Sequence, residues 1–303
     1  MVVAAEPLAG LLAELRRRDY QFTAVTPATH ARVLARPVRH RPTLRDVFGW
    51  NRPFAHDDLD PNMFELLDAA QAVKGAGANL RSKVRVASLG TDLFVHTGFP
   101  TQAPDSVFFG PDTYRFARFV AAQLGRIGPV GHLVDMGAGS GAGAISAARA
   151  QQVGSITMVD VNRAALALAR ANLLAASLAA ELICADRLPA GHDVVIANPP
   201  YIVDPDGRTY RDGGGLLGGA VALAWVEQFL DGGRGTMLLY TGAAVAAGRS
   251  PLLDAIGETC RLAGASVAVE EIDVDVFGEE LELAHYDCVE RIAAVGLVIE
   301  QRA

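Results

Sequence analysis

The chain has 303 residues, half of them apolar, which is enough to bury a large core in one large domain with a smaller one beside it. Its three widely spaced cysteines predict neither a disulfide framework nor a zinc site, so we expect no metal. No run approaches the roughly 18 apolar residues of a membrane-spanning helix, and the first residues lack a secretory signal. We therefore expect a cytoplasmic protein without membrane contacts.

The net charge of −7 is distributed unevenly. Residues 1–56 carry nine arginines against only four carboxylates, so this segment is basic and the remainder is acidic. The nine are Arg16, Arg17, Arg18, Arg32, Arg36, Arg39, Arg41, Arg45 and Arg52. A basic segment on an acidic body predicts docking of a polyanion such as RNA or DNA, and a solvated arginine surface is the alternative.

The first third of the chain has a mixed pattern. Residues 7–19 place leucines at three- and four-residue spacing, which predicts an amphipathic helix, and a second helix is expected over 62–73. Prolines between them favour loops and short helices. Residues 83–87 and 92–97 predict two strands of a hairpin. We interpret residues 1–107 as a small mixed α/β accessory domain for substrate recognition.

From about residue 108 onward, strands and helices alternate. Such alternation predicts a mostly parallel sheet with helices on both faces, in a catalytic domain of residues 108–303. Seven apolar runs are the expected strands: 132–136, 155–161, 181–185, 193–197, 235–240, 266–272 and 292–299.

The first of these strands runs into a glycine-rich turn. Gly137, Gly139, Gly141 and Gly143 alternate with small residues before a helix-like stretch. Glycines at a strand-to-helix turn allow a tight bend and a close approach of the backbone to a ligand. The pattern therefore predicts a nucleotide-type binding turn.

Three carboxylates indicate which ligand the turn binds. Gly137, Gly139 and Ala142 fit a dinucleotide fingerprint, so an NAD(P)-dependent oxidoreductase remains an alternative. Asp135, however, would repel a pyrophosphate and attract a cationic amino group. Asp160 follows the second strand, where a carboxylate can hold both ribose hydroxyls, and Asp186 follows the third, where it can reach an adenine amine.

With these residues the sequence resembles the class I S-adenosylmethionine (SAM)-dependent methyltransferases. The resemblance implies a Rossmann-like fold with a mostly parallel seven-stranded sheet. It also implies that the turn from Asp135 through Gly137, Gly139, Ser140 and Gly141 holds the methionine part of SAM. By the same resemblance, Asp160 binds the ribose and Asp186 contacts the adenine.

The fourth strand ends in Asn198-Pro199-Pro200-Tyr201. Proline restricts its own backbone and that of its predecessor, so Asn198 and the Pro199 carbonyl are predicted to be two rigid acceptors for an NH2 group. Accepting both protons turns the nitrogen lone pair toward a methyl donor, and Tyr201 offers a ring for stacking. Asn198 also lies where it can touch the cofactor.

This motif resembles that of the release-factor glutamine methyltransferases and of enzymes that methylate an exocyclic amine of adenine or guanine. It implies a nitrogen acceptor in rRNA, tRNA or DNA, or a glutamine amide in a protein. We favour nucleic acid over protein, and RNA over DNA. A SAM-fold binding protein without catalysis remains open, as does the oligomeric state.

Two further segments bear on the site. The polar, glycine-rich loop 204–215 is either a substrate-covering flap or a connector. Asp112 and Thr113 precede an apolar helix over 116–124 and are expected to cap it.

Overall fold

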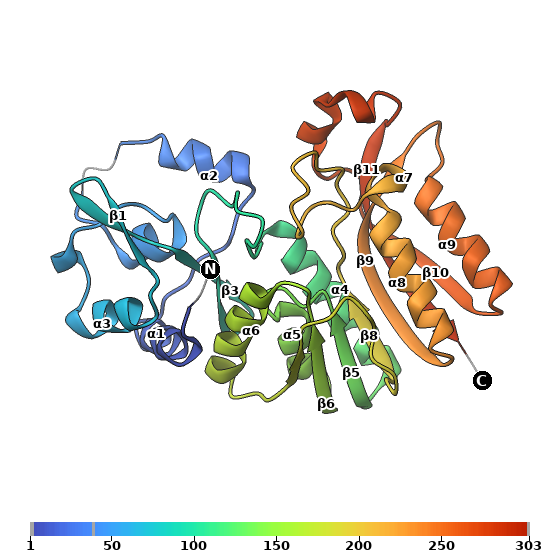
Figure 1. The fold of residues 1–303 in the computed structure, drawn as a ribbon, viewed down its shortest axis with the longest axis horizontal. Helices are drawn as coiled ribbons and strands as arrows, with labels where there is room; N and C mark the ends of the chain where they lie inside the picture. The colour runs from blue at the N-terminus through green and yellow to red at the C-terminus, as the bar shows by residue number, and fades with distance from the viewer. Residues whose placement is uncertain (1–2, 38–39, 302–303) are drawn as a thin grey trace.

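The computed structural model describes residues 3–37 and 40–301, which fold into two lobes (Figure 1). One lobe comes from the first hundred residues and the other holds a seven-stranded sheet. Among the described residues, none of the helices combines the length and the apolar character that crossing a bilayer requires.

The first lobe contains short elements around its own apolar core. Leu8, Leu11, Leu12 and Leu15 of the first helix are completely buried in that core, as their spacing predicted. The elements are α1 (Ala5–Arg17), α2 (Pro27–Leu34), the π-helix η1 (Arg45–Gly49), the 3-10 helix η2 (His56–Asp58), α3 (Pro61–Ala69), β1 (Val73–Ala76), β2 (Asn79–Ser82), β3 (Val84–Leu89) and β4 (Asp92–Thr97).

Two details of this lobe differ from the sequence predictions. The helix expected over 62–73 ends at Ala69, because Gln71 adopts a left-handed backbone with φ of 55° and the chain continues into β1. The β1–β2 hairpin was not predicted at all, since its sequence is rich in glycine and poor in β-branched residues. The β3–β4 hairpin was predicted and is confirmed.

The second lobe begins with a helix and then alternates strands and helices. Its elements are α4 (Pro111–Ile127), β5 (Val130–Met136), α5 (Ala142–Ala150), β6 (Val153–Val159), α6 (Arg163–Ala176), β7 (Glu181–Ile183), β8 (Val194–Ala197), α7 (Gly215–Gly218), α8 (Ala220–Asp231), β9 (Gly235–Val245), α9 (Pro251–Leu262), β10 (Ser266–Asp273), the 3-10 helices η3 (Gly278–Glu282) and η4 (Ala284–Tyr286), and β11 (Arg291–Gln301).

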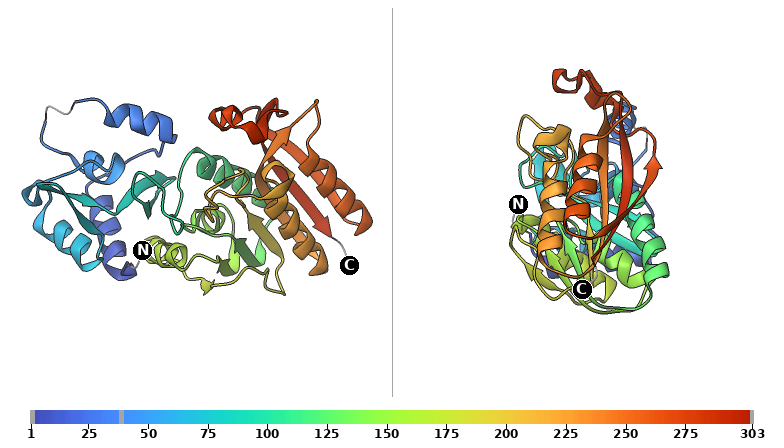
Figure 2. Two further views of the ribbon diagram at one scale, coloured as in Figure 1. Left: turned by 45° about the horizontal axis from the view of Figure 1, so that its top comes forward. Right: turned by 90° about the vertical axis from the view of Figure 1, so that its right-hand side faces the viewer.

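The seven strands form one sheet in the order β10-β11-β9-β8-β5-β6-β7. Strands β5 to β9 are parallel, and β11 is antiparallel to both of its neighbours. Helices α8 and α9 cover one face and α4 and α5 the other (Figures 1 and 2). Alternate residues of the central strand serve the two cores, with Leu133 on the α4 side and Val134 on the α8 side.

This strand order, with a single antiparallel strand inserted near one edge, is the class I methyltransferase arrangement, so the predicted fold class is confirmed. The two lobes meet where α1 packs on α6, and the core of the first lobe includes Ala165, Leu168 and Ala171 of that helix. A domain boundary between residues 107 and 108 stays a prediction.

Candidate active site

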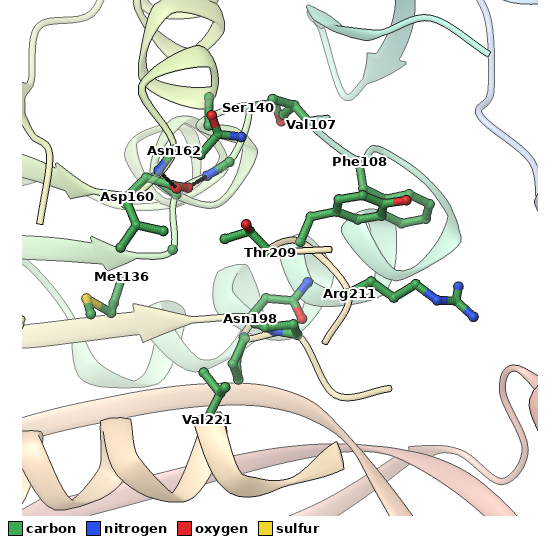
Figure 3. Close-up of a pocket in the computed structure, with 18 of the residues that line it drawn as sticks. Val107, Phe108, Met136, Ser140, Asp160, Asn162, Asn198, Thr209, Arg211 and Val221 are labelled. Atoms are coloured by element: carbon green, nitrogen blue, oxygen red, sulfur yellow. Dashed lines mark hydrogen bonds between the residues drawn. The ribbon is translucent and has the colours of Figure 1, made fainter. Parts of the chain in front are cut away.

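A cavity of about 420 Å³ opens at the carboxyl ends of β5, β6, β7 and β8. Ligands of open α/β sheets bind at this edge, where the strand order reverses, and the volume is in the range of small-molecule sites. In Figure 3, Asp160 and Asn162 lie at one end of the cavity, Phe108 and Arg211 at the other, and Asn198 between them.

The glycine turn forms one wall of the cavity. Gly137, Gly139 and Gly141 have φ angles of 71°, 55° and 77°, a region that side chains disfavour. Gly137, Gly139 and Ser140 line the cavity, as predicted for cofactor contacts. Gly141 does not line it. A β-carbon here would meet Met158 and Ala169, and the residue caps α5, so a role for Gly141 in cofactor binding stays a prediction.

Asp135 is a buried carboxylate at the end of β5. Its Oδ2 accepts a hydrogen bond from the Ala144 amide at 2.9 Å, and among the described residues no basic side chain pairs with it. Burial, with a smaller contribution from the nearby Asp160, raises its pKa to about 7. A buried carboxylate that lines a cavity without a cation is a site for an ammonium group.

Asp160 is held by backbone amides at the end of β6. Its Oδ2 accepts a hydrogen bond from Gly139 and its Oδ1 one from Asn162, each at 2.8 Å. Each oxygen keeps a free lone pair, so two adjacent hydroxyls can still bind. Asp186 lines the cavity beyond β7 but is exposed.

Trp225 of α8 is a cavity residue that the sequence analysis missed. A β-carbon on Gly137 would lie 2.5 Å from the Cη2 atom of this indole, so the ring covers the glycine turn. Gln228, one helical turn later, accepts a hydrogen bond from the Leu188 amide at 2.9 Å and thereby fixes α8 to the loop that carries Asp186. In the sequence Trp225 is an isolated tryptophan in a helix, and nothing in the pattern around it indicates that its ring lines a binding site.

Asn198 lies directly after β8 and faces the cavity (Figure 3). It is half-buried, and among the described residues its side-chain amide makes no hydrogen bond within the protein. Pro199 and Pro200 follow it along the cavity wall. An amide with free donors and acceptors at this position is available to a ligand.

Tyr201 is fixed more tightly than a stacking residue would need to be. It is only 7% exposed, and a β-carbon on Gly242 of β9 would lie 2.1 Å from its ring. Its hydroxyl donates a 2.5 Å hydrogen bond to Oδ2 of Asp112, while the Tyr240 hydroxyl donates to Oδ1 at 2.9 Å. The ring lines the cavity as a packed wall, and burial raises the pKa of Asp112.

The two residues expected to cap α4 have different roles in the structure. Thr113 accepts a hydrogen bond from the Gly110 amide at 3.2 Å and caps the helix. Asp112 instead joins the two tyrosines and pairs with Arg115 at 3.2 Å, which in turn binds Asp273 of β10 at 2.7 Å. This network ties α4 to the residues after β8.

The loop 204–215 lies over the cavity, and Gly207, Thr209, Tyr210, Arg211 and Asp212 line it. The Tyr210 hydroxyl donates to the Thr101 carbonyl at 2.7 Å, which connects this loop to the segment between the two lobes. Arg211 is held by an ion pair with Glu280. The position over the cavity supports the flap interpretation.

The basic front segment is largely engaged in internal contacts. Arg17 and Arg18 both pair with Glu14, and Arg16 donates to the Ala175 carbonyl at 3.1 Å. Arg32 and Arg36 are exposed and form no ion pair within the described residues. Arg39 lies outside the described residues. Most of the described arginines of this segment thus make internal contacts, and a polyanion that bound Arg32 or Arg36 would replace no ion pair among the described residues.

The cavity fits SAM on three observations. The buried, cation-free Asp135 suits the amino group, the amide-held Asp160 suits ribose hydroxyls, and the indole of Trp225 lines the cavity beside the glycine turn. A pyrophosphate at this turn would instead lie against two carboxylates, which disfavours NAD.

Comparison with known proteins supports the fold-level assignment. A family model described as methyltransferase small domain matches residues 116–210, which include the glycine turn, the three carboxylates predicted to bind the cofactor and the Asn198 motif. Residues 116–210 thus match a methyltransferase small domain, and the family resemblance drawn from the sequence is confirmed.

Two curated proteins match parts of the chain. A release factor glutamine methyltransferase of Bordetella pertussis is 36% identical over 111 residues, covering 34% of this chain and 40% of its own length. A ribosomal RNA small subunit methyltransferase C of Pseudomonas putida is 34% identical over 76 residues, covering 24% of this chain and 23% of its own. The chain therefore spans less than half of either relative.

A solved structure extends the match to the fold. Wild-type Trm5b from Pyrococcus abyssi superposes with a TM-score of 0.50 at 14% identity, over 80% of this chain and 68% of that one. At this identity the similarity establishes the shared fold.

Proposed function

We propose that this chain is a SAM-dependent N-methyltransferase that acts on an exocyclic amine of adenine or guanine in a nucleic acid, with RNA favoured over DNA. The observation that carries the proposal is the side-chain amide of Asn198. It faces the cavity between the predicted cofactor carboxylates and a group of aromatic rings, and it has no hydrogen-bond partner within residues 3–37 and 40–301. We expect the enzyme to work in the cytoplasm.

Three groups of the protein prepare the cofactor end. The ionised Asp135 binds an ammonium group, both oxygens of Asp160 accept from ribose hydroxyls, and the Gly137–Ser140 turn lets the backbone approach closely. When bound, SAM supplies a methyl group on a positively charged sulfur. The relatives matched in sequence, an rRNA methyltransferase and a glutamine methyltransferase, support this choice of cofactor.

Asn198 orients the acceptor. Its Oδ1 and the Pro199 carbonyl each accept one proton of an NH2 group, which turns the nitrogen lone pair away from the conjugated system and toward the methyl group. The two prolines keep these acceptors rigid, so little reorganisation is needed at the transition state. The carbon–sulfur bond would break as the carbon–nitrogen bond forms, and the methylated, positively charged nitrogen would then release one proton to solvent, so no general base is required.

A glutamine amide of a protein is the alternative acceptor, since it presents the same NH2 group. An NAD(P)-dependent oxidoreductase is a remote third possibility. Calorimetric titration of the purified chain with SAM and with NAD separates the cofactors: we expect SAM to bind and NAD not to. NAD binding as tight as SAM binding would refute the proposal.

A labelling experiment separates the acceptors. Extract from a strain that lacks this protein is incubated with the pure chain and SAM carrying a tritiated methyl group. We expect RNase to release the label. Label released by protease would favour the glutamine alternative. If no fraction carried label, the chain would be a SAM-binding protein without methyltransferase activity.

A further inference from the structure

The acceptor end of the cavity differs in character from the cofactor end. Beyond Asn198 the wall is formed by Phe108 and by Thr209 of the flap (Figure 3), and the neighbouring Tyr210 also lines the cavity. The two arginines of the flap are neutralised, since Arg208 pairs with Asp204 and Arg211 with Glu280. Recognition at this end therefore depends on aromatic surface more than on charge.

Tyr201 is not free to supply that surface. Its ring is pressed against Gly242 and meets Phe277 edge-on at 5.7 Å between centroids, and its hydroxyl is bound to Asp112. Turning the ring toward an acceptor would break its buried hydrogen bond to the Asp112 carboxylate and leave a packing cavity beside β9.

Phe108 and Tyr210 are placed differently. Both are half-buried, both line the cavity, and their rings are nearly parallel, with an interplanar angle of 7° and centroids 6.3 Å apart. Each ring is fixed by its own contact. A β-carbon on Gly110 would lie 2.4 Å from Cζ of Phe108, and the Tyr210 hydroxyl is bonded to Thr101.

Resting on the proposed function, we infer that Phe108 and Tyr210 form an aromatic platform on which an unstacked nucleobase lies while its amine binds Asn198. Every base has an extended π-face, so two parallel rings hold it with little dependence on sequence. A base inside a duplex cannot reach a cavity of this kind, so the substrate is single-stranded or the base is flipped out. A glutamine side chain has no ring and would leave most of the platform unused.

The platform also explains how the two lobes cooperate. Phe108 belongs to the segment that leads from the β3–β4 hairpin into α4, and Tyr210 belongs to the flap after β8. The hydrogen bond from Tyr210 to Thr101 joins the two segments. Opening the flap would move Tyr210 away from Phe108 and give the base access to the faces of the rings.

The test uses the full chain saturated with S-adenosylhomocysteine and titrated with 2-aminopurine riboside 5′-monophosphate, whose fluorescence falls when the base stacks. We expect quenching by the wild-type chain. Phe108→Ala and Tyr210→Ala should each weaken binding about 5- to 150-fold, the range measured for removal of one stacking ring. Tyr210→Phe should bind nearly as well as the wild type because the ring remains.

Phe64→Ala is the matched control, since it removes a half-buried phenylalanine of α3 outside the cavity. SAM affinity, measured in parallel, should be unchanged in all four variants. Equal quenching by the wild type, Phe108→Ala and Tyr210→Ala would overturn the platform. Methyl transfer to N-acetylglutamine amide at the same rate by the wild type and both alanine variants would also overturn it. A wild-type chain that fails to bind SAM would instead overturn the proposed function.

Discussion

The two ends of the cavity are built in different ways. At the proposed cofactor end, the two buried carboxylates Asp135 and Asp160 lie at the ends of β5 and β6, and backbone amides of Gly139, Ala144 and Asn162 hold them in place. At the acceptor end, the groups come from segments far apart in the chain, and long-range contacts such as Tyr201 with Asp112 hold them. The first end is therefore set by the fold, while the second depends on how flap and lobes meet.

This difference predicts that binding and chemistry can be separated by mutation. Asn198→Ala should leave SAM affinity nearly unchanged and lower kcat by about 10²–10³, because it removes a preorganised acceptor from the transition state only. Single-turnover methyl transfer and calorimetry on the same preparation measure the two quantities. Transfer at the wild-type rate would refute the nitrogen-methylation mechanism.

Asp160→Ala should have the opposite effect. It removes the carboxylate predicted to bind the ribose, so SAM affinity should fall about 10- to 150-fold, at about 1.5–3 kcal/mol for a hydrogen bond to a charged group. Asp231→Ala, which changes an exposed carboxylate at the end of α8, is the control. Unchanged SAM affinity in the Asp160 variant would contradict the cofactor assignment.

The pH dependence of SAM binding sharpens the role of Asp135. Because burial raises its pKa to about 7, the carboxyl is protonated in the free protein below pH 7 and binds an ammonium group poorly. We expect SAM affinity to rise by up to about tenfold per pH unit between pH 5 and 7 and then to level off. Calorimetry across this range measures it, and Asp135→Asn should abolish the rise.

The stability of the free protein should respond to pH in the opposite sense. The pKa of Asp135 is higher in the folded chain than its ordinary value of 3.8, so the folded state binds this proton more tightly. The free energy of unfolding contributed by this group therefore falls as pH rises from about 4 to 7. A wild-type contribution that grows over this range, relative to Asp135→Asn, would contradict the buried, cation-free state of this carboxyl.

The smallest effect is expected at Trp225. Replacing its indole by phenylalanine should weaken SAM binding about two- to tenfold, as for the loss of one aromatic contact. The chain has two tryptophans, and Trp50 packs against Phe22 in the first lobe. SAM should therefore change the fluorescence of Trp50→Phe but not that of Trp225→Phe. The reverse pattern would show that the Trp225 indole does not contact the cofactor.

Most of the residues predicted for the cofactor end line one cavity, because their sequence signals are local. Asp135 precedes the glycine turn, and the other two carboxylates follow two further strands. Parallel strands bring their carboxyl ends to the same edge of the sheet, so these residues are expected to lie close together. Gly141 was the exception, since which glycine of a turn faces the ligand depends on backbone angles that the spacing does not encode.

The acceptor end was predicted less completely. Asn198 could be predicted because two prolines follow it in the sequence. The hydrogen bond from Tyr201 to Asp112 could not, because Asp112 is 89 residues away and was expected only to cap α4. Trp225 and Phe108 were missed because their place in the cavity depends on how α8 and the segment before α4 pack. Such tertiary contacts leave no local pattern.

The chemical position of the transferred methyl group tests the central claim most directly. RNA labelled by the wild-type chain is digested to nucleosides and analysed by mass spectrometry, with Asn198→Ala as the matched reaction. The account predicts one nucleoside methylated on an exocyclic nitrogen in the wild-type reaction and almost none with the variant. A methyl group on carbon or on a ribose oxygen, or equal yields from both proteins, would contradict it.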